Sequence, residues 1–331
     1  ARKSLGRAIT AAEAADGVLK LTVWREPGSV LEVGLRLPVL GRYSPAAPYD
    51  CAKSARILDA ACKVLERETL DQGRSLWSAV SALALLATGR EAYLPAVRTF
   101  ARELAGKLAT ADGGGAWDCG YHGLFLAEYH LLTGDKEVLP AIEALTLRLA
   151  EGQGRYGTYG HGFSERTPTG GLHGAIPPYG ALNQAGLIAS LAVVMGQKCG
   201  IRHPEIDPAI ERANRFYAYY VDKGPIPYGE HEPFMCHENN GKNALAAVMY
   251  GIQGPRWRRE ARYYARMATA GYANREYGHT GQGFGYLWSA LGANVGGPAA
   301  VGAFLHEVAW HLDLARRSDG AFTYDGGEQC G

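Results

Sequence analysis

The sequence predicts a mainly α-helical protein, an α/α toroid of about five to six helical hairpins with a small N-terminal β-hairpin segment. Three features predict this fold. Apolar residues recur with helical spacing from Asp50 to near the C-terminus. A helix–turn–helix pattern repeats along that part of the chain. Its helices also alternate between charge-poor and charged, as expected when one helix of each pair is buried on both sides and the other faces solvent.

The overall charge excludes some classes of partner. The 331 residues include 34 basic and 33 acidic side chains, a net charge of +1, which argues against nucleic acid. No apolar run approaches the roughly 18 residues of a membrane span, so no membrane insertion is expected. Tyr outnumbers Phe by 19 to 8. That excess suggests aromatic surfaces that also form hydrogen bonds, as in sugar-binding clefts, although packing of loops explains it equally well.

Residues 1–38 are expected to form a helix over 5–15 and then a β-hairpin. Strands 19–24 and 30–37 alternate polar and apolar residues and flank a Pro-Gly turn. Because a lone hairpin is marginally stable in water, another part of the chain is expected to cover it. A helix followed by two terminal strands resembles the C-terminal part of a PDZ domain. Residues 39–49 are interpreted as a linker.

The toroid is expected over residues 50–331, with Asp50 capping a first helix over 51–66. Its repeat is clearest where Thr88-Gly89 matches Thr133-Gly134, 45 residues later. Each pair follows a small apolar helix and precedes a longer charged helix that begins near a proline. The predicted helix pairs are 75–87 with the helix after Pro95, 119–132 with the helix after Pro140, 180–195 with 208–220, 243–250 with 255–269, and 285–293 with 298–315.

The connections between these helices alternate in length. The long ones, 109–118, 152–179, 222–242 and 271–282, all lead from a charged helix to an apolar one. In an alternating ring they share one end, together with the N-termini of the apolar helices, which attract anions weakly. We therefore expect a polar cleft there. Six of the ten histidines fall in these segments or at the first turn of an apolar helix, although loop histidines also make purely local hydrogen bonds: His122, His161, His173, His231, His237 and His279.

The residue types at this end favour an enzyme acting on a carbohydrate polymer, either a hydrolase or a lyase. Hydrolysis needs two carboxylates, and a uronate lyase needs an acid and a base with a group that neutralises the substrate carboxylate. His237 is the proposed base or acid, Asn239 and Asn240 orient or neutralise substrate, and Glu238 or Glu230 is the carboxylate partner. His161 and Tyr159 complete the catalytic candidates; Glu232 is a further carboxylate. The binding candidates are Asp118, Tyr121, His122, His173, Tyr179, Asn183, Tyr228, Lys242 and His279.

Two other interpretations stay open. Trp117-Asp-Cys-Gly-Tyr-His-Gly123 and Cys236-His237 resemble motifs of lanthionine synthetase cyclases, which are also α/α toroids. That resemblance implies a zinc ion held by Cys119, Cys236 and His237, but Glu rather than Gly follows the Cys-His pair and the spacing differs. Otherwise no cofactor is expected. The polar loops could instead serve a non-catalytic module that binds a glycan or a protein.

The chain as a whole resembles a family of exported bacterial proteins in which a PDZ domain precedes a helical toroid domain. The resemblance is carried by Pro48-Tyr-Asp-Cys-Ala-Lys-Ser, Leu126-Ala-Glu-Tyr, Tyr179-Gly-Ala-Leu-Asn-Gln-Ala-Gly, His237-Glu-Asn-Asn-Gly-Lys-Asn and Asp319-Gly-Ala-Phe. It implies the fold, a periplasmic or secreted location, and a protein partner for the N-terminal segment, but no reaction. Terpene cyclases share the toroid, but their acidic DxDD motif is absent here.

Overall fold

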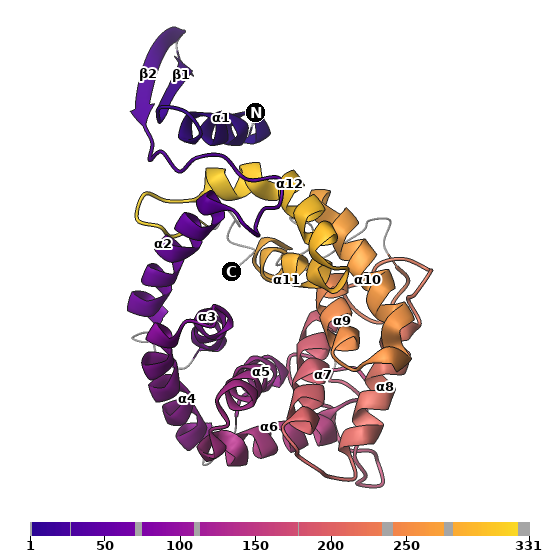
Figure 1. The fold of residues 1–331 in the computed structure, drawn as a ribbon. Coiled ribbons are helices and arrows are strands. Elements are labelled where there is room, and N and C mark those ends of the chain that lie inside the picture. The colour runs from indigo at the N-terminus through magenta and orange to yellow at the C-terminus, as the bar shows by residue number, and fades with distance from the viewer. Residues whose placement is uncertain are drawn as a thin grey trace. The chain divides into compact units, whose positions relative to one another are not determined.

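The computed structural model describes residues 2–26, 28–69, 75–108, 113–177, 179–233, 241–274 and 281–323. Within these ranges the chain forms twelve α-helices and one antiparallel two-stranded sheet, so the mainly helical class is confirmed (Figure 1). None of the described helices is long and apolar enough to cross a membrane. The chain divides into two compact units. Unit 1 comprises residues 1–64 and 298–325, and unit 2 comprises 65–297 and 326–331.

Unit 1 contains the N-terminal elements and the last helix. Its elements are α1 (Arg2–Glu13), β1 (Val18–Arg25), β2 (Ser29–Arg36), the first part of α2 (Ala52–Thr69), and α12 (Pro298–Ala315). The predicted hairpin is confirmed, with Val18 opposite Arg36 and Arg25 opposite Ser29. The rest of unit 1 covers little of this hairpin, because Leu19 is the only buried residue of the two strands.

A cluster of buried charges ties α1, α2 and α12 together in unit 1. Lys53 is fully buried, and its Nζ lies 2.8 Å from both Glu13 Oε2 and Asp313 Oδ2. Arg316 also pairs with both carboxylates. The hydroxyl of Tyr43 donates to Asp313 Oδ1 at 2.8 Å. Two cations therefore balance two anions, as buried charge requires. The sequence pattern gave no sign of this cluster.

The helices of unit 2 lie in two rows (Figure 1). The first row is α3 (Leu76–Ala87), α5 (Ala116–Thr133), α7 (Asn183–Lys198), α9 (Lys242–Gly251) and α11 (Gly281–Val295), each packed against the next. The second row is α4 (Leu94–Leu108), α6 (Leu139–Gly152), α8 (Ile206–Ala218) and α10 (Arg258–Ala270). Short 3₁₀ turns η1 (Glu91–Tyr93), η2 (Lys136–Val138) and η3 (Pro255–Trp257) lead from the first row to the second, and η4 (Gly271–Ala273) follows α10.

Burial explains why the rows differ in composition. Every residue of α7 except Gln197 and Lys198 is buried, whereas α10 buries only its stripe of small and aromatic residues. Glycine lets the first-row helices approach closely. A Cβ on Gly292 of α11 would lie 2.4 Å from Ala244 Cα of α9, and one on Gly120 of α5 would lie 3.0 Å from an Ile188 methyl. Glycine at these two positions therefore allows close helix packing.

The 45-residue repeat has an atomic counterpart. The Thr88 hydroxyl donates to a carbonyl of the preceding turn at 2.7 Å and accepts from the amide two residues on at 3.2 Å. The Thr133 hydroxyl makes the same two bonds at 2.7 and 3.3 Å. Gly89 and Gly134 follow with φ of 66° and 71°, a left-handed conformation that glycine adopts without strain. The two Thr-Gly turns are therefore alike, although α5 includes its threonine and α3 ends one residue before its own.

Some expected boundaries were wrong. The first helix begins at Arg2 rather than Leu5, and α7 begins at Asn183 because Leu182 is extended. Asp50 does not cap α2. Its φ is 44°, and the carbonyl of Cys51 accepts the first helical bond, from the Ala55 amide. The cap therefore lies one residue later than the sequence pattern indicated.

Candidate functional site

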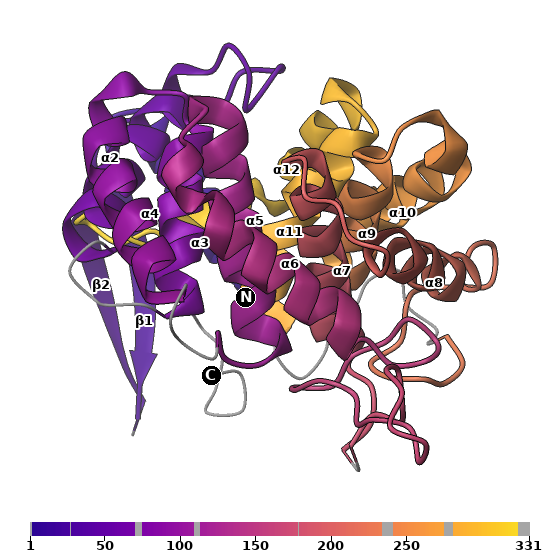
Figure 2. The same cartoon turned by 90° about the horizontal axis from the view of Figure 1, so that it is seen from below.

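The loop between α6 and α7 and the loop between α8 and α9 meet at the N-termini of the first-row helices (Figure 2). The Ala116 amide, in the first turn of α5, donates to the His161 carbonyl at 2.9 Å. The Asn183 amide, which opens α7, donates to the Tyr228 carbonyl at 2.9 Å. In α9, Asn243 Oδ1 accepts from a backbone amide of the second loop at 3.0 Å. The described long loops therefore lie at one end, as their alternating lengths predicted.

Four aromatic residues at this end of the helices, Trp117, His161, Tyr179 and Tyr228, form a continuous line. Trp117 Nε1 donates to His161 Nδ1 at 3.1 Å, with ring centroids 6.4 Å apart. The His161 and Tyr179 rings lie 5.1 Å apart, and the Tyr179 and Tyr228 hydroxyls lie 3.1 Å apart. Burial, together with the hydrogen bond to Tyr179, raises the pKa of Tyr228 to about 12. Tyr179 is 66% exposed, so the line is open to solvent. We call these four residues the aromatic line.

A pocket of about 640 Å³, which we call the Glu230 pocket, opens beside the loop that carries Tyr228. It combines two carboxylates, a histidine, three guanidinium groups and four aromatic rings. Its lining residues are Arg155, Tyr156, Arg212, Arg215, Phe216, Tyr219, Tyr220, Glu230, His231 and Glu232. The Thr158 hydroxyl donates to Glu230 Oε1 at 2.9 Å and fixes that carboxylate. Burial, then the nearby charge of Glu230, raises the pKa of Tyr220 to about 12, so its hydroxyl stays protonated at neutral pH.

Asn183 positions the loop that carries the pocket's acidic residues. Its side chain is fully buried, and Nδ2 donates to the carbonyls of Pro227 at 3.0 Å and Gly229 at 2.9 Å. His231 completes the turn, since its Nδ1 lies 3.0 Å from the Glu232 carbonyl and its Nε2 lies 3.4 Å from the Gly229 amide. In this arrangement Nδ1 donates to the Glu232 carbonyl and Nε2 accepts from the Gly229 amide. Asn183 therefore acts as a loop anchor.

Comparison with known proteins assigns the chain to a family. The model of a domain of unknown function, DUF6288, matches residues 54–331, most of the chain. The chain belongs to the DUF6288 family. Searches of curated proteins and of solved structures found no match.

Several sequence candidates in the DUF6288 domain are buried rather than presented to a ligand. Tyr159 is fully buried and donates to the Leu149 carbonyl at 2.9 Å; burial raises its pKa well above the ordinary value. Tyr121 is buried and accepts from Trp288 Nε1 at 3.2 Å. His122 and Lys242 are also buried. Their positions favour roles in packing and in anchoring the loops.

Asp118 and His173 lie nearer the surface, but each has local partners. Asp118 accepts from the Gly115 amide at 3.4 Å and so caps α5. His173 has a left-handed backbone with φ of 63°. Its Nδ1 lies 2.8 Å from the Gln153 carbonyl, and its Nε2 lies 2.9 Å from Glu205 Oε2 and 3.1 Å from an Arg212 nitrogen. His173 thus joins the loop to α8, behind the Glu230 pocket.

Six candidates lie outside the described residues: Cys236, His237, Glu238, Asn239, Asn240 and His279. The zinc alternative needs two of them and stays a prediction. Its third ligand, Cys119, is buried and its thiol donates to the Gly113 carbonyl at 3.3 Å. Among the residues that the structure does describe, no group of three or more His, Cys, Asp or Glu side chains is arranged to hold a metal ion.

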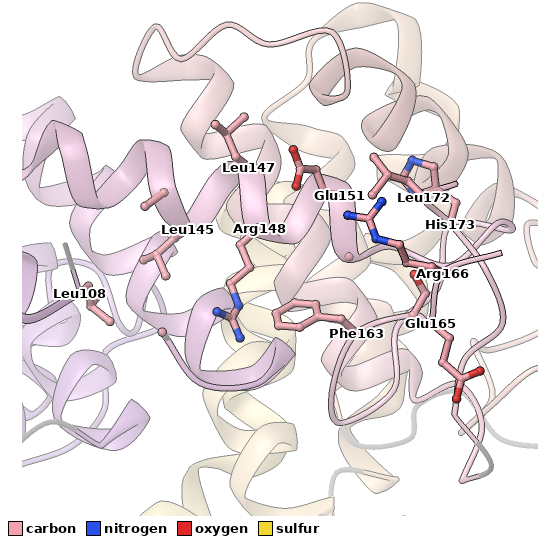
Figure 3. Close-up of a pocket in the computed structure, with 14 residues that line it drawn as sticks. Leu108, Leu145, Leu147, Arg148, Glu151, Phe163, Glu165, Arg166, Leu172 and His173 are labelled. Carbon is pink, nitrogen blue, oxygen red and sulfur yellow. The ribbon is translucent and has the colours of Figure 1, made fainter. Parts of the chain in front are cut away.

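A second hollow, of about 550 Å³, lies between α6 and the loop that follows it (Figure 3). Arg148 of α6 extends its guanidinium group over the Phe163 ring, 4.9 Å from the centroid, and donates to the Gly114 carbonyl at 3.0 Å. Arg166 and His173 also line this hollow. His173 is the one sequence candidate among its lining residues.

The sequence interpretation missed the contribution of α8. Arg212, Arg215, Phe216 and Tyr219 all line the Glu230 pocket, and their spacing of i, i+3, i+4 and i+7 places them on one helical face. Phe216 is half-buried and Tyr219 is 51% exposed. A mixed aromatic and basic stripe on an otherwise charged second-row helix was the signal that could have identified them.

Proposed function

We propose that this DUF6288 domain is a carbohydrate-active enzyme, a polysaccharide hydrolase or lyase, and that the Glu230 pocket is the centre of its site. One observation carries the proposal: the pocket places Glu230 and Glu232 among three guanidinium groups and exposed tyrosine rings. Aromatic faces pack against sugar rings, and arginine binds carboxylates in a planar, bidentate manner. An acidic polysaccharide matches both features.

The chemistry assigned to the pocket follows from its carboxylates and bases. In hydrolysis, one carboxyl group protonates the leaving oxygen and a second acts as base or nucleophile. Glu230, held by Thr158, and Glu232 fill these roles. In a lyase, Arg212 and Arg215 neutralise the substrate carboxylate and a base removes the adjacent proton. The C–O bond to the leaving sugar then breaks as the C=C bond forms, and the leaving oxygen takes a proton from an acid of the site. His237, with Asn239 and Asn240 to orient the substrate, remains the proposed base.

The aromatic line extends this proposed site beyond the pocket. Tyr228 is two residues from Glu230, and the line runs from it through Tyr179 and His161 to Trp117. A polymer occupies several consecutive sugar positions, so a row of partly exposed rings that begins two residues from Glu230 suits it better than a small substrate. We further infer that the two helix rows belong to an α/α toroid, which the alternation of buried and charged helices supports.

The test is an assay of the purified protein against a panel of polyuronates and neutral polysaccharides. New reducing ends report cleavage of either kind, and ultraviolet absorbance of an unsaturated product reports a lyase. Glu230→Gln and Glu232→Gln are expected to lower kcat/KM by about 100-fold or more, the usual contribution of a catalytic acid or base. Glu143→Gln, which changes an exposed carboxylate of α6 away from the pocket, is the matched control.

Binding measurements separate the enzyme from a non-catalytic module. If a polysaccharide binds, loses affinity in Arg212→Gln, and is never cleaved, the domain is a glycan-binding module and the enzymatic proposal is wrong. If no polysaccharide of the panel binds or reacts, the carbohydrate assignment itself is refuted. Equal activity of Glu230→Gln, Glu232→Gln and Glu143→Gln would place the chemistry outside the Glu230 pocket.

A further inference from the structure

Unit 1 contains a large pocket of its own, with a volume of about 810 Å³, which lies within the usual range for small-molecule sites. It is formed by α1, the segment after the hairpin, α2 and α12, and all of its lining residues belong to unit 1. The lining is mostly apolar: Ile57 and Leu58 come from α2, Leu305 and Trp310 from α12, and Phe322 closes one side. Leu58 and Phe322 are 46% and 41% exposed, so apolar surface is left open to solvent.

The hydroxyl groups of this lining are already engaged within the protein. Thr10 Oγ1 donates to Asp313 at 2.6 Å, and Tyr43 donates to the same carboxylate. Ser44 Oγ donates to a backbone carbonyl at 3.3 Å. Ser54 hydrogen-bonds the Cys51 sulfur. A ligand that needs many hydrogen bonds along its length therefore finds few partners here.

The charged groups of the lining are all basic. Arg7 and Arg42 line the pocket, both are exposed, and within the described part of the chain neither has an ion pair or hydrogen bond. His306 also lines it, 3.5 Å from Glu307. Among the residues that the structure describes, no Asp or Glu lines the pocket. The pocket thus combines an apolar interior with two uncompensated guanidinium groups at its edge, which favours an anion there.

We propose that this pocket binds an anionic amphiphile, namely a long-chain carboxylate. The acyl chain lies against the apolar side chains of α2 and α12, and the carboxylate pairs with Arg7 and Arg42. An acyl chain has no polar atoms to satisfy, which matches a lining whose hydroxyls are occupied. A peptide would bring a backbone amide and carbonyl at each residue, and leaving these unsatisfied is costly.

The test uses dodecanoate, below the concentration at which it forms micelles, with dodecanol as the neutral counterpart of equal chain length. Native mass spectrometry of the full chain counts bound ligands, and calorimetry gives affinity. One dodecanoate is expected to bind with a Kd in the micromolar range, and dodecanol roughly tenfold more weakly because it lacks the charge. The double variant Arg7→Gln/Arg42→Gln is expected to bind dodecanoate only as tightly as it binds dodecanol. Arg36→Gln, on exposed β2, is the charge control and leaves affinity unchanged.

A second variant tests the apolar part. Gly302 of α12 lines the pocket, and a Cβ there meets only the Ala47 carbonyl oxygen, at an ordinary distance of 3.7 Å. Gly302→Phe therefore fills the pocket without a clash at its base, and glycine is in any case unfavourable inside a helix. It is expected to abolish binding of both ligands. Gly106→Phe, at an open position on α4 outside the pocket, is the matched control.

Three results would overturn the proposal. The first is the absence of dodecanoate binding to the unaltered protein. The second is unchanged dodecanoate affinity in Gly302→Phe, which would place the ligand elsewhere. The third is tighter binding of a peptide with an apolar C-terminal residue than of dodecanoate, which would make the pocket a peptide site. This inference is independent of the Glu230 pocket, so failure of one test leaves the other unaffected.

Discussion

The buried charge cluster of unit 1 allows a quantitative prediction about Lys53. Replacing Lys53 with Met keeps an unbranched side chain of similar length and removes one charge. The ammonium group loses two contacts of 2.8 Å, to Glu13 and Asp313, and both of these carboxylates are almost fully buried. Arg316 is then the remaining cation for two anions. The variant therefore has an uncompensated negative charge in its interior.

The size of the effect follows from that uncompensated charge rather than from the lost attraction. Breaking a buried ion pair by removing one partner costs about 3–5 kcal/mol, whereas an exposed pair contributes about 0–1 kcal/mol. Since Lys53 is fully buried and serves two carboxylates, we expect Lys53→Met to lower the free energy of unfolding by about 3–5 kcal/mol. Adding Glu13→Gln removes the surplus charge and should restore part of this loss.

Urea unfolding, followed by tryptophan fluorescence and circular dichroism, measures the difference. The matched control is Lys3→Met, which removes an exposed lysine 3.8 Å from Glu307 in the same unit. That change is expected to cost about 1 kcal/mol or less. The reasoning would be refuted if Lys53→Met and Lys3→Met were equally stable, or if Glu13→Gln destabilised the Lys53→Met background further.

Three further predictions concern single side chains. Asn183→Ala should free the loop that carries Glu230, seen as faster proteolysis between α8 and α9; unchanged cleavage would contradict the anchoring role. Hydrogen bonds from Arg102 and Tyr129 lower the pKa of Asp135 from 3.8 to about 2, so its contribution to stability is present above pH 3.8 and is lost as the pH falls towards 2. Asp135→Asn should therefore unfold more easily than wild type at pH 7 but equally easily near pH 2 in thermal melts. Burial raises the pKa of Cys51, but hydrogen bonds from Ser54 and Ser44 outweigh it and lower the pKa to about 7. Alkylation mapped by mass spectrometry should therefore show a midpoint near pH 7 at Cys51, and a midpoint at the ordinary thiol value of 9.0 or above would contradict this.

The sequence predicted the helical architecture well because that architecture depends on local patterns. Helix periodicity, the threonine-glycine endings and proline near helix starts are all read within one or two turns. The bounds of α3 and α12 came within one residue for this reason. The buried cluster around Lys53 could not be predicted in the same way. Asp313 of α12 lies 260 residues along the chain from Lys53 and 303 from Thr10, so no local pattern connects them. A lysine at the start of an amphipathic helix is also ordinarily exposed.

The sequence predicted where the long loops lie, but not which of their side chains are buried. Loop lengths placed the long loops at one end, and the described loops do meet there at the first turns of α5, α7 and α9. Residue type alone did not distinguish ligand-facing groups from anchors. Tyr159 and Asn183 were candidates because of their chemistry. In the structure the Tyr159 hydroxyl and the Asn183 side-chain amide donate to backbone carbonyls of the protein itself. Burial decides that difference, and burial depends on packing that a single sequence does not reveal.

The arrangement of the two rows explains which residues remain for chemistry. The first-row helices α7 and α9 are covered on nearly all sides, so a polar residue in their first turns must find a partner within the protein, as Asn183 and Asn243 do. A second-row helix has one open face, and α8 turns basic and aromatic side chains from that face toward the Glu230 pocket. Apart from Trp117 of α5, the groups available to a substrate therefore come from the loops and from second-row helices. By this argument Glu230, Glu232 and Arg212 are stronger catalytic or binding candidates than any residue at a first-row N-terminus.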